Sequence, residues 1–97
     1  MYVVQRVFAR PSTSVDFYKS SSEFNSHLTA TYITTGKLSQ NKTVSPDGLK
    51  MTVTMIWGDQ ASFAEYEADP VCAAHFTARN DYNTANGITA DRTATEV

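Results

Sequence analysis

The clearest pattern in the chain is Leu49-Lys50-Met51-Thr52-Val53-Thr54-Met55-Ile56-Trp57, in which a large apolar residue occupies every second position. Successive side chains of a β-strand point to opposite faces, so this alternation predicts a strand with one face toward a core. Just before it, Pro46-Asp47-Gly48 predicts a tight turn, because proline presets one backbone dihedral angle and glycine adopts the left-handed conformation. The polar run 37–45 is then predicted to be the other strand of an antiparallel hairpin, at a sheet edge.

Residues 2–9 form a second apolar strand. Its side chains alternate between two apolar faces, one with Tyr2, Val4 and Phe8 and the other with Val3, Val7 and Ala9. A strand that is apolar on both faces is typical of a position that is covered on both sides. We therefore expect this strand at the centre of a sheet.

A helix is predicted between these two strands. Pro11-Ser12-Thr13-Ser14 ends the first strand and offers hydroxyl groups that cap helices. An apolar stripe at helical spacing follows, made of Phe17, Ser21, Phe24 and Leu28. The helix should fade near Leu28, because the β-branched residues of 29–35 extend helices poorly.

The last part of the chain predicts two more helical segments and an edge strand. Asp59 is a good cap for a short helix that ends near Ala68, and Asp69-Pro70 is a good start for the next one. The expected inward stripe of this second helix is Val71, Ala74 or His75, Ala78, Tyr82 and Ala85. Asn86-Gly87 ends it, and 88–97 alternates small and polar residues as an edge strand does.

The order strand, helix, strand, strand, helix, strand predicts an α+β fold, the ferredoxin-like βαββαβ antiparallel sheet with helices on one face. The 97 residues leave room for a single domain, 1–97. Two helices cover only one face of a four-stranded sheet, yet the first strand is apolar on both faces. We therefore expect a homodimer in which a second copy covers the other face.

Composition excludes several classes of function. The net charge of −2 provides no basic surface for nucleic acid, and no apolar run approaches the roughly 20 residues that span a bilayer. The start of the chain lacks a signal-peptide pattern and Cys72 is the only cysteine, so we expect a cytoplasmic protein without disulfides. Cys72 and His27 are interpreted as a packing residue and a helix-end residue, and no spacing of ligand residues predicts a metal site.

One segment resembles a known family. It comprises Trp57-Gly58-Asp59-Gln60-Ala61-Ser62-Phe63-Ala64-Glu65-Tyr66 and Asp69-Pro70-Val71-Cys72-Ala73-Ala74-His75. A strand ending in Trp, a helix with two aromatic residues, an Asp-Pro break and a helix with His resemble the dimeric α+β barrel superfamily, near its antibiotic-biosynthesis-monooxygenase-like branch. The resemblance implies a barrel of two facing sheets.

The same resemblance bears on function. Members of the superfamily include cofactor-independent oxygenases that act on quinols or polyketides, and haem-degrading enzymes with an Asn, a Trp and a His. Here the His corresponds to His75, the Trp to Tyr66, and the Asn falls near Gln5 or Arg6. Two of the three residues are replaced, so the resemblance does not imply haem degradation, and we expect no cofactor.

Five residues are candidates for a site between the helices and the sheet. His75 is the candidate catalytic residue, as a base, a ligand or a hydrogen-bond partner of a substrate, although a partly buried histidine bonded to backbone or water is the simpler interpretation. The other four are candidates for a ligand pocket: Trp57, Tyr66, Arg6 and Arg79. Packing also accounts for Trp57 and Tyr66, and solvation for Arg79.

Arg6 stands in an otherwise apolar strand, so it is expected to need a partner. Either a bound anion or an ion pair between subunits would satisfy it. Two functions therefore stay open: a small-molecule-binding or interaction module with an aromatic ligand, and a cofactor-independent monooxygenase-like enzyme that acts on a quinol, aromatic or polyketide-like substrate.

Overall fold

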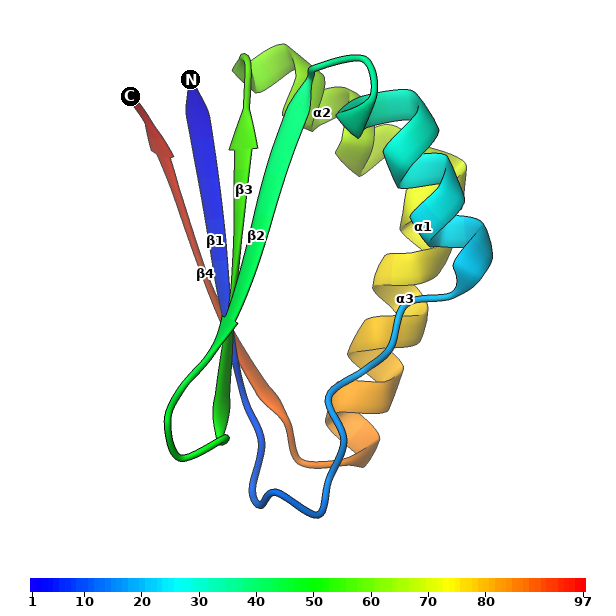
Figure 1. The fold of residues 1–97 in the computed structure, drawn as a ribbon. Helices are drawn as coiled ribbons and strands as arrows, with labels where there is room; N and C mark the ends of the chain where they lie inside the picture. Colours follow the sequence, from blue (N-terminus) through cyan, green and yellow to red (C-terminus); the bar gives the residue numbers. More distant parts are fainter.

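A computed structural model describes all residues, 1–97, and Figure 1 shows their arrangement. The elements in chain order are β1 (Tyr2–Ala9), α1 (Ser22–Leu28), η1 (Thr29–Ile33), β2 (Leu38–Val44), β3 (Lys50–Trp57), α2 (Gln60–Ala68), α3 (Pro70–Ala85) and β4 (Thr89–Glu96). The strands form one antiparallel sheet in the order β2-β3-β1-β4. The ferredoxin-like α+β fold and its two central strands are as the sequence predicts.

The two faces of the sheet differ sharply. All the helices lie on one face, where Val4 and Phe8 of β1 and Val53, Met55 and Trp57 of β3 are buried (Figure 1). The other face carries Val3, Gln5 and Val7 of β1 beside Thr52, Thr54 and Ile56 of β3. No element of the chain covers this second face, and Ile56 is 37% exposed.

The first helix starts later than the sequence predicts. Residues 10–21 are irregular, and α1 begins at Ser22, where the Ser21 hydroxyl accepts a hydrogen bond from the Phe24 amide at 3.1 Å. Serine and threonine favour turns over helix interiors, and Arg10 ties the segment down by donating to the Val15 and Gly48 carbonyls. The expected stripe therefore holds only for Phe24 and Leu28, which are buried.

The chain also stays helical beyond Leu28. Residues 29–33 form the wider π-helix η1, in which the Thr34 amide donates to the Thr29 carbonyl at 2.8 Å. This turn buries Tyr32, which is 2% exposed. Burial of that ring overrides the weak helix propensity of its β-branched neighbours.

The predicted boundaries of the last two helices are confirmed. Asp59 caps α2 and Asp69 caps α3, each through a carboxylate that accepts a backbone amide hydrogen bond. The expected inward stripe of α3 is correct at Val71, His75 and Tyr82, which are half-buried, and wrong at Ala78 and Ala85, which are exposed. The helix also turns Cys72, Phe76, Arg79 and Asn83 inward. Larger side chains are needed to bridge the space between helix and sheet.

No helix in the structure has the length and apolar character that crossing a membrane requires.

Candidate functional site

Arg6 interrupts the core of the molecule. Along the inward face of β1, Val4 belongs to a large buried cluster near α2, and Phe8 belongs to a smaller one that includes Val53 and Ile88. Arg6 lies between them on the same face, and a charged side chain there cannot pack as an apolar one does. A cavity occupies the region where the two clusters meet.

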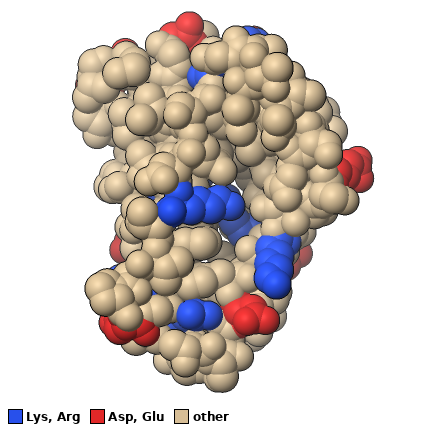
Figure 2. All heavy atoms as spheres, in the orientation of Figure 1, with Lys and Arg blue, Asp and Glu red and all other residues tan.

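The cavity lies between the sheet and the helices, opens to solvent, and leaves about 70 Å³ for the centres of water-sized molecules. Its wall comes from every layer of the fold. The lining residues are Arg6, Phe8, Phe17, Tyr18, Ser20, Phe24, Asn25, Leu28, Gln40, Lys42, Met51, Val53, Met55, Tyr66, His75, Arg79 and Asn83. Figure 2 shows the hollow between sheet and helices, with Lys and Arg atoms inside it and at its rim.

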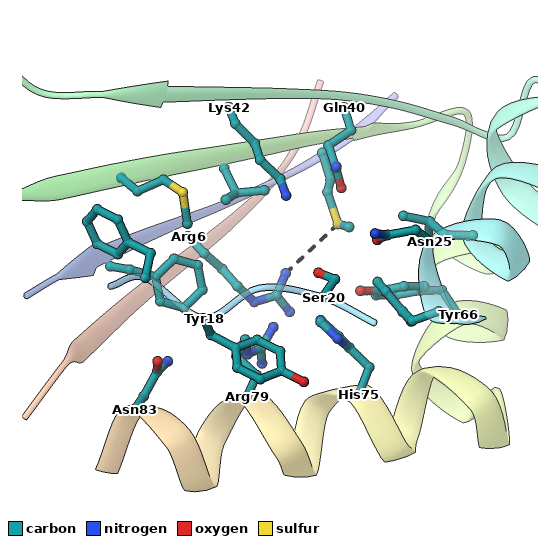
Figure 3. Close-up of a pocket in the computed structure, with 17 residues that line it drawn as sticks. Arg6, Tyr18, Ser20, Asn25, Gln40, Lys42, Tyr66, His75, Arg79 and Asn83 are labelled. Carbon is teal, nitrogen blue, oxygen red and sulfur yellow. Dashed lines mark hydrogen bonds between the residues drawn. The ribbon is translucent and has the colours of Figure 1, made fainter. Parts of the chain in front are cut away.

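Three cations line this cavity, and no carboxylate does. Figure 3 shows Arg6 from β1, Lys42 from β2 and Arg79 from α3 pointing into the same space. The only hydrogen bond of the Arg6 side chain is a weak one of 4.0 Å to the Met55 sulfur. Burial lowers the pKa of Arg6, and the positive charge of Arg79 lowers it further. The site thus concentrates positive charge that the chain itself does not neutralise.

His75 lies at the aromatic side of the cavity. Its ring stacks on Phe24 with centroids 3.7 Å apart and nearly parallel planes, and Tyr18 is 5.7 Å away. Its Nδ1 atom is buried without a hydrogen-bond partner. Burial lowers the pKa of His75 to about 4, and the charges of Arg79, Lys42 and Arg6 act in the same direction. The imidazole is therefore neutral near pH 7, and it can donate a hydrogen bond to a ligand or accept one from it.

Tyr66 also lines the cavity, although only 1% of the residue is exposed. Burial raises the pKa of Tyr66 to about 12, against the opposing effect of Arg6. Its hydroxyl makes no hydrogen bond within the chain, whereas the hydroxyls of Tyr32 and Tyr82 do. Tyr66 thus presents a neutral hydroxyl that is free to bond to a ligand.

Trp57 lies elsewhere. The residue is 0% exposed and is enclosed by Tyr32, Phe63 and Tyr66, with ring centroids 5.0–5.8 Å away. It does not line the cavity, so the structure departs here from the expected pocket wall. The side chains of α2 and η1 close around it because Trp57 ends β3 at the most densely covered end of the sheet.

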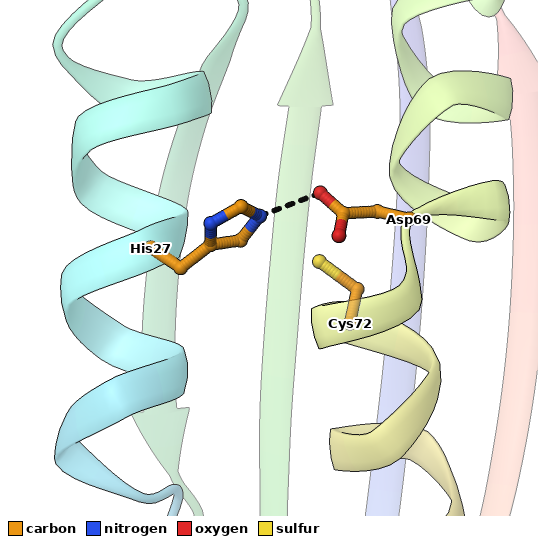
Figure 4. Close-up of side chains that lie close together, drawn as sticks. All are labelled: His27, Asp69 and Cys72. Carbon is orange, nitrogen blue, oxygen red and sulfur yellow. Dashed lines mark hydrogen bonds and ion pairs between the residues drawn. The ribbon is translucent and has the colours of Figure 1, made fainter.

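A second cluster of polar side chains joins α1 to the start of α3. The Asp69 carboxylate accepts hydrogen bonds from His27 Nε2 at 2.6 Å and from the Tyr32 hydroxyl at 2.7 Å, and Figure 4 shows Cys72 beside them. Although burial acts in the opposite direction, these bonds lower the pKa of Asp69 to about 2. Burial and the nearby Asp69 charge raise the pKa of the Cys72 thiol to about 12.

His27, Asp69 and Cys72 are residue types that bind metals, and their ligand atoms lie within 4.8 Å of one another. No sequence pattern predicts this group, because His27 lies 42 residues before Asp69 in the chain. Each polar atom of Asp69 is already engaged, by His27, Tyr32 and the Val71 amide. These hydrogen bonds explain the cluster as a structural junction between α1 and the start of α3.

Sequence reasoning found Arg6, Tyr66, His75 and Arg79 but missed several other cavity residues. Lys42 and Gln40 were assigned to a polar edge strand, although they share a face with the buried Leu38 by simple alternation. That alternation was a usable signal. Tyr18 and Ser20 lie in the irregular segment 10–21, where no periodicity marks which side chains turn inward.

The fold matches solved structures of known proteins. SnoaB, a cofactor-independent oxygenase from Streptomyces nogalater, superposes with a TM-score of 0.67 at 14% identity, over 99% of this chain and 91% of that one. The monooxygenase from the gene ActVA-Orf6 of Streptomyces coelicolor, solved with nanaomycin D, gives 0.60 at 13%, over 99% and 88%. A dimeric ferredoxin-like protein from an uncultured marine organism gives 0.50 at 11%, over 99% and 95%.

No protein-family model and no curated protein matches the sequence. At these low identities the structural matches establish the fold alone. The chain has the ferredoxin-like fold found in antibiotic-biosynthesis-monooxygenase-like proteins, as the sequence resemblance implied.

Proposed function

We propose that this protein binds a small planar aromatic molecule in the cavity between the sheet and α3. The observation that carries the proposal is the lining, in which five aromatic side chains surround a space with a few polar groups: Phe8, Phe17, Tyr18, Phe24 and Tyr66. Binding sites for small molecules are usually concave and mainly apolar, with few polar groups that fix orientation.

Two polar groups are suited to orient such a ligand. The Nδ1 of His75 is buried without a partner, and the Tyr66 hydroxyl, at the cavity wall, makes no hydrogen bond within the chain. A buried polar atom without a partner costs about 1–3 kcal/mol, so a ligand that bonds to it recovers this free energy. We expect the aromatic ring of a ligand to contact His75, which is stacked on Phe24.

Ligand binding is tested with naphthol, a planar phenol, by measuring the rise in melting temperature on addition of ligand. We expect the wild type to be stabilised and Ser20→Trp, which places a large ring at the cavity wall, to show little or no effect. Ser26→Trp adds the same ring at an exposed position of α1 outside the lining and serves as the control. Equal responses from both variants would contradict binding in this cavity.

A second candidate function is cofactor-independent oxygenation of a phenol of the quinol or polyketide type. The likeness in fold to the oxygenase from Streptomyces nogalater favours it. In the net reaction one phenolic O–H and one ring C–H bond break, and O₂ supplies one atom to the new carbonyl group. The other oxygen atom leaves with both hydrogens as water, so the quinone forms without an added reductant.

In this reaction His75 would accept the phenolic proton. Proton transfer by a positioned side chain is typically worth about 10²–10⁴-fold in rate, so we expect His75→Ala to lower turnover by that factor. Oxygen consumption with naphthol analogues measures it, with one O₂ used for each quinone formed. Binding without any oxygen consumption would leave the protein a binding module.

We further propose that the chain acts as a homodimer through the open face of the sheet. The support is the uncovered row of Val3, Val7 and Ile56, on the face opposite the helices. Val7→Glu places a charge at the centre of that face and should yield monomers in analytical ultracentrifugation. A wild type that sediments as a monomer at high micromolar concentration would contradict the proposal.

A further inference from the structure

Arg6 is a partly buried cation without a counter-ion. The ion pairs of the chain join other groups: the N-terminus with Glu96, His27 with Asp69, Lys37 with Glu65, and Arg92 with Glu67. The guanidinium of Arg6 has five N–H donors, and only the distant sulfur of Met55 accepts from one. Moving a charge from water into a protein costs free energy unless the charge is paired. We therefore expect Arg6 to bind an anion.

The other groups that line the cavity add positive charge and no carboxylate. The titratable groups that line the cavity are Arg6 from β1, Lys42 from β2, Tyr66 from α2, His75 and Arg79 from α3, and Tyr18 from the irregular segment. The three basic side chains are cationic, and His75 and Tyr66 are neutral near pH 7. Arg79 makes only long hydrogen bonds, of 3.3 Å, to Asn80.

A second copy of the chain would not supply the missing anion. The proposed dimer contact uses the open face of the sheet, whereas Arg6 points to the helix side, as Figure 3 shows. The sheet itself separates Arg6 from the partner. Of the two sources expected from the sequence, an ion pair between subunits and a bound anion, the geometry favours the bound anion.

We propose that the aromatic ligand carries an anionic oxygen group, a carboxylate or an ionised phenol, held among Arg6, Arg79 and Lys42. The planar guanidinium of arginine donates two parallel hydrogen bonds to such a group, and lysine adds a point charge. The aromatic part of the ligand lies toward Tyr66 and toward Phe24, the ring on which His75 stacks. This inference rests on the proposed aromatic ligand and specifies its chemical class.

The first experiment compares naphthoate with its neutral isostere naphthamide by titration calorimetry. Charge-assisted hydrogen bonds discriminate by about 10- to 100-fold, so we expect the wild type to prefer naphthoate by that factor. Arg6→Met and Arg79→Met should reduce this preference severalfold while naphthamide binding is kept. Lys19→Met removes an exposed charge outside the cavity and should leave it unchanged.

A second arm uses naphthol, whose ionised form has a distinct absorbance. A positive charge nearby lowers the pKa of an acid by about 1–3 units, so bound naphthol should ionise at a lower pH than free naphthol. Arg6→Met should remove most of this shift. A gain for naphthoate alone identifies a carboxylate ligand, and a shift for naphthol alone identifies a phenolate ligand; either result supports the inference.

The outcomes separate the two proposals. Equal affinity for naphthoate and naphthamide, with no shift in the ionisation of naphthol, overturns the anionic ligand and leaves aromatic binding intact. A preference that survives in both arginine variants overturns the assignment to these cations. If none of the three compounds binds, the proposed function fails and this inference fails with it.

Discussion

Two partly buried charged regions of the molecule are arranged in opposite ways. At the junction of α1 and α3, the Asp69 carboxylate accepts hydrogen bonds from His27, Tyr32 and the Val71 amide. In the cavity, Arg6 lies among Lys42, Arg79, His75 and Tyr66, and no carboxylate is part of the lining. A charge that is satisfied by its own chain stabilises the structure, whereas an unsatisfied charge lowers stability and points to a ligand.

The largest effect is expected at the satisfied junction. Asp69→Ala removes the cap of α3 and strands both His27 and Tyr32, so we expect a loss of about 3–4 kcal/mol in the free energy of unfolding. Urea denaturation measures it. Asp59→Ala removes only the exposed cap of α2 and should cost clearly less. Equal losses of unfolding free energy in the two variants would show that Asp69 acts only as a helix cap.

The two regions should also respond to acid in different pH ranges. The pKa of His75 is lowered from 6.5 to about 4, so the unfolded state binds more protons between these values and stability falls as pH drops through them. The loss is at most about 3–4 kcal/mol, and solvent around the half-buried ring makes it smaller. For Asp69, with a pKa of about 2, stability is lost only below its unfolded value near 3.8.

Urea denaturation at pH 7, 5 and 4 tests the His75 contribution. His75→Phe keeps a ring on Phe24 without a titratable group, so its stability should change less over this range than that of the wild type. An unchanged pH dependence would show that the imidazole is more solvated than its burial indicates.

In the cavity, removal of the unsatisfied charge should stabilise the free protein. Arg6→Met replaces a cation by an apolar side chain of similar length beside Met55, and such replacements of buried charges gain about 1–3 kcal/mol. The melting temperature without ligand should rise, whereas Lys19→Met should leave it unchanged. Destabilisation by Arg6→Met would mean that the guanidinium already has a partner.

The smallest effect separates two buried tyrosines. Tyr32→Phe removes a hydrogen bond to Asp69 and should cost about 1 kcal/mol in the free energy of unfolding. Tyr66→Phe removes a hydroxyl that bonds to nothing in the chain, so it should leave stability nearly unchanged and weaken naphthol binding instead. A greater loss of stability in Tyr66→Phe than in Tyr32→Phe would show that the Tyr66 hydroxyl stabilises the fold more than the Tyr32 hydroxyl does.

The sequence predicted the sheet well because its signals are local. Alternation in 49–57 and the Pro46-Asp47-Gly48 turn depend only on near neighbours, and the central strands follow from their apolar residues. Asp59 and Asp69 marked helix starts for the same reason. Such features do not depend on tertiary contacts, so they survive in the folded structure.

The errors arose where tertiary contacts override local preference. The irregular segment 10–21 is held by Arg10, whose two carbonyl partners come from Val15 and from the distant Gly48. Tyr32 is buried by a π-turn that its β-branched neighbours do not favour. The junction of His27 with Asp69 joins residues that no pattern connects. In the cavity, Arg6 was noticeable as a charge in an apolar strand, whereas its lack of an anion required the fold.

The position of β1 has a consequence for how the chain is assembled in time. Its hydrogen-bonding neighbours are β3 and β4, which both come later in the sequence, β4 at the far end. During synthesis the first strand emerges long before either partner, and one of its two hydrogen-bonding edges stays unpaired until Thr89–Glu96 has been synthesised. Pairings between distant segments form slowly, so the most apolar strand is also the last to gain its complete set of neighbours.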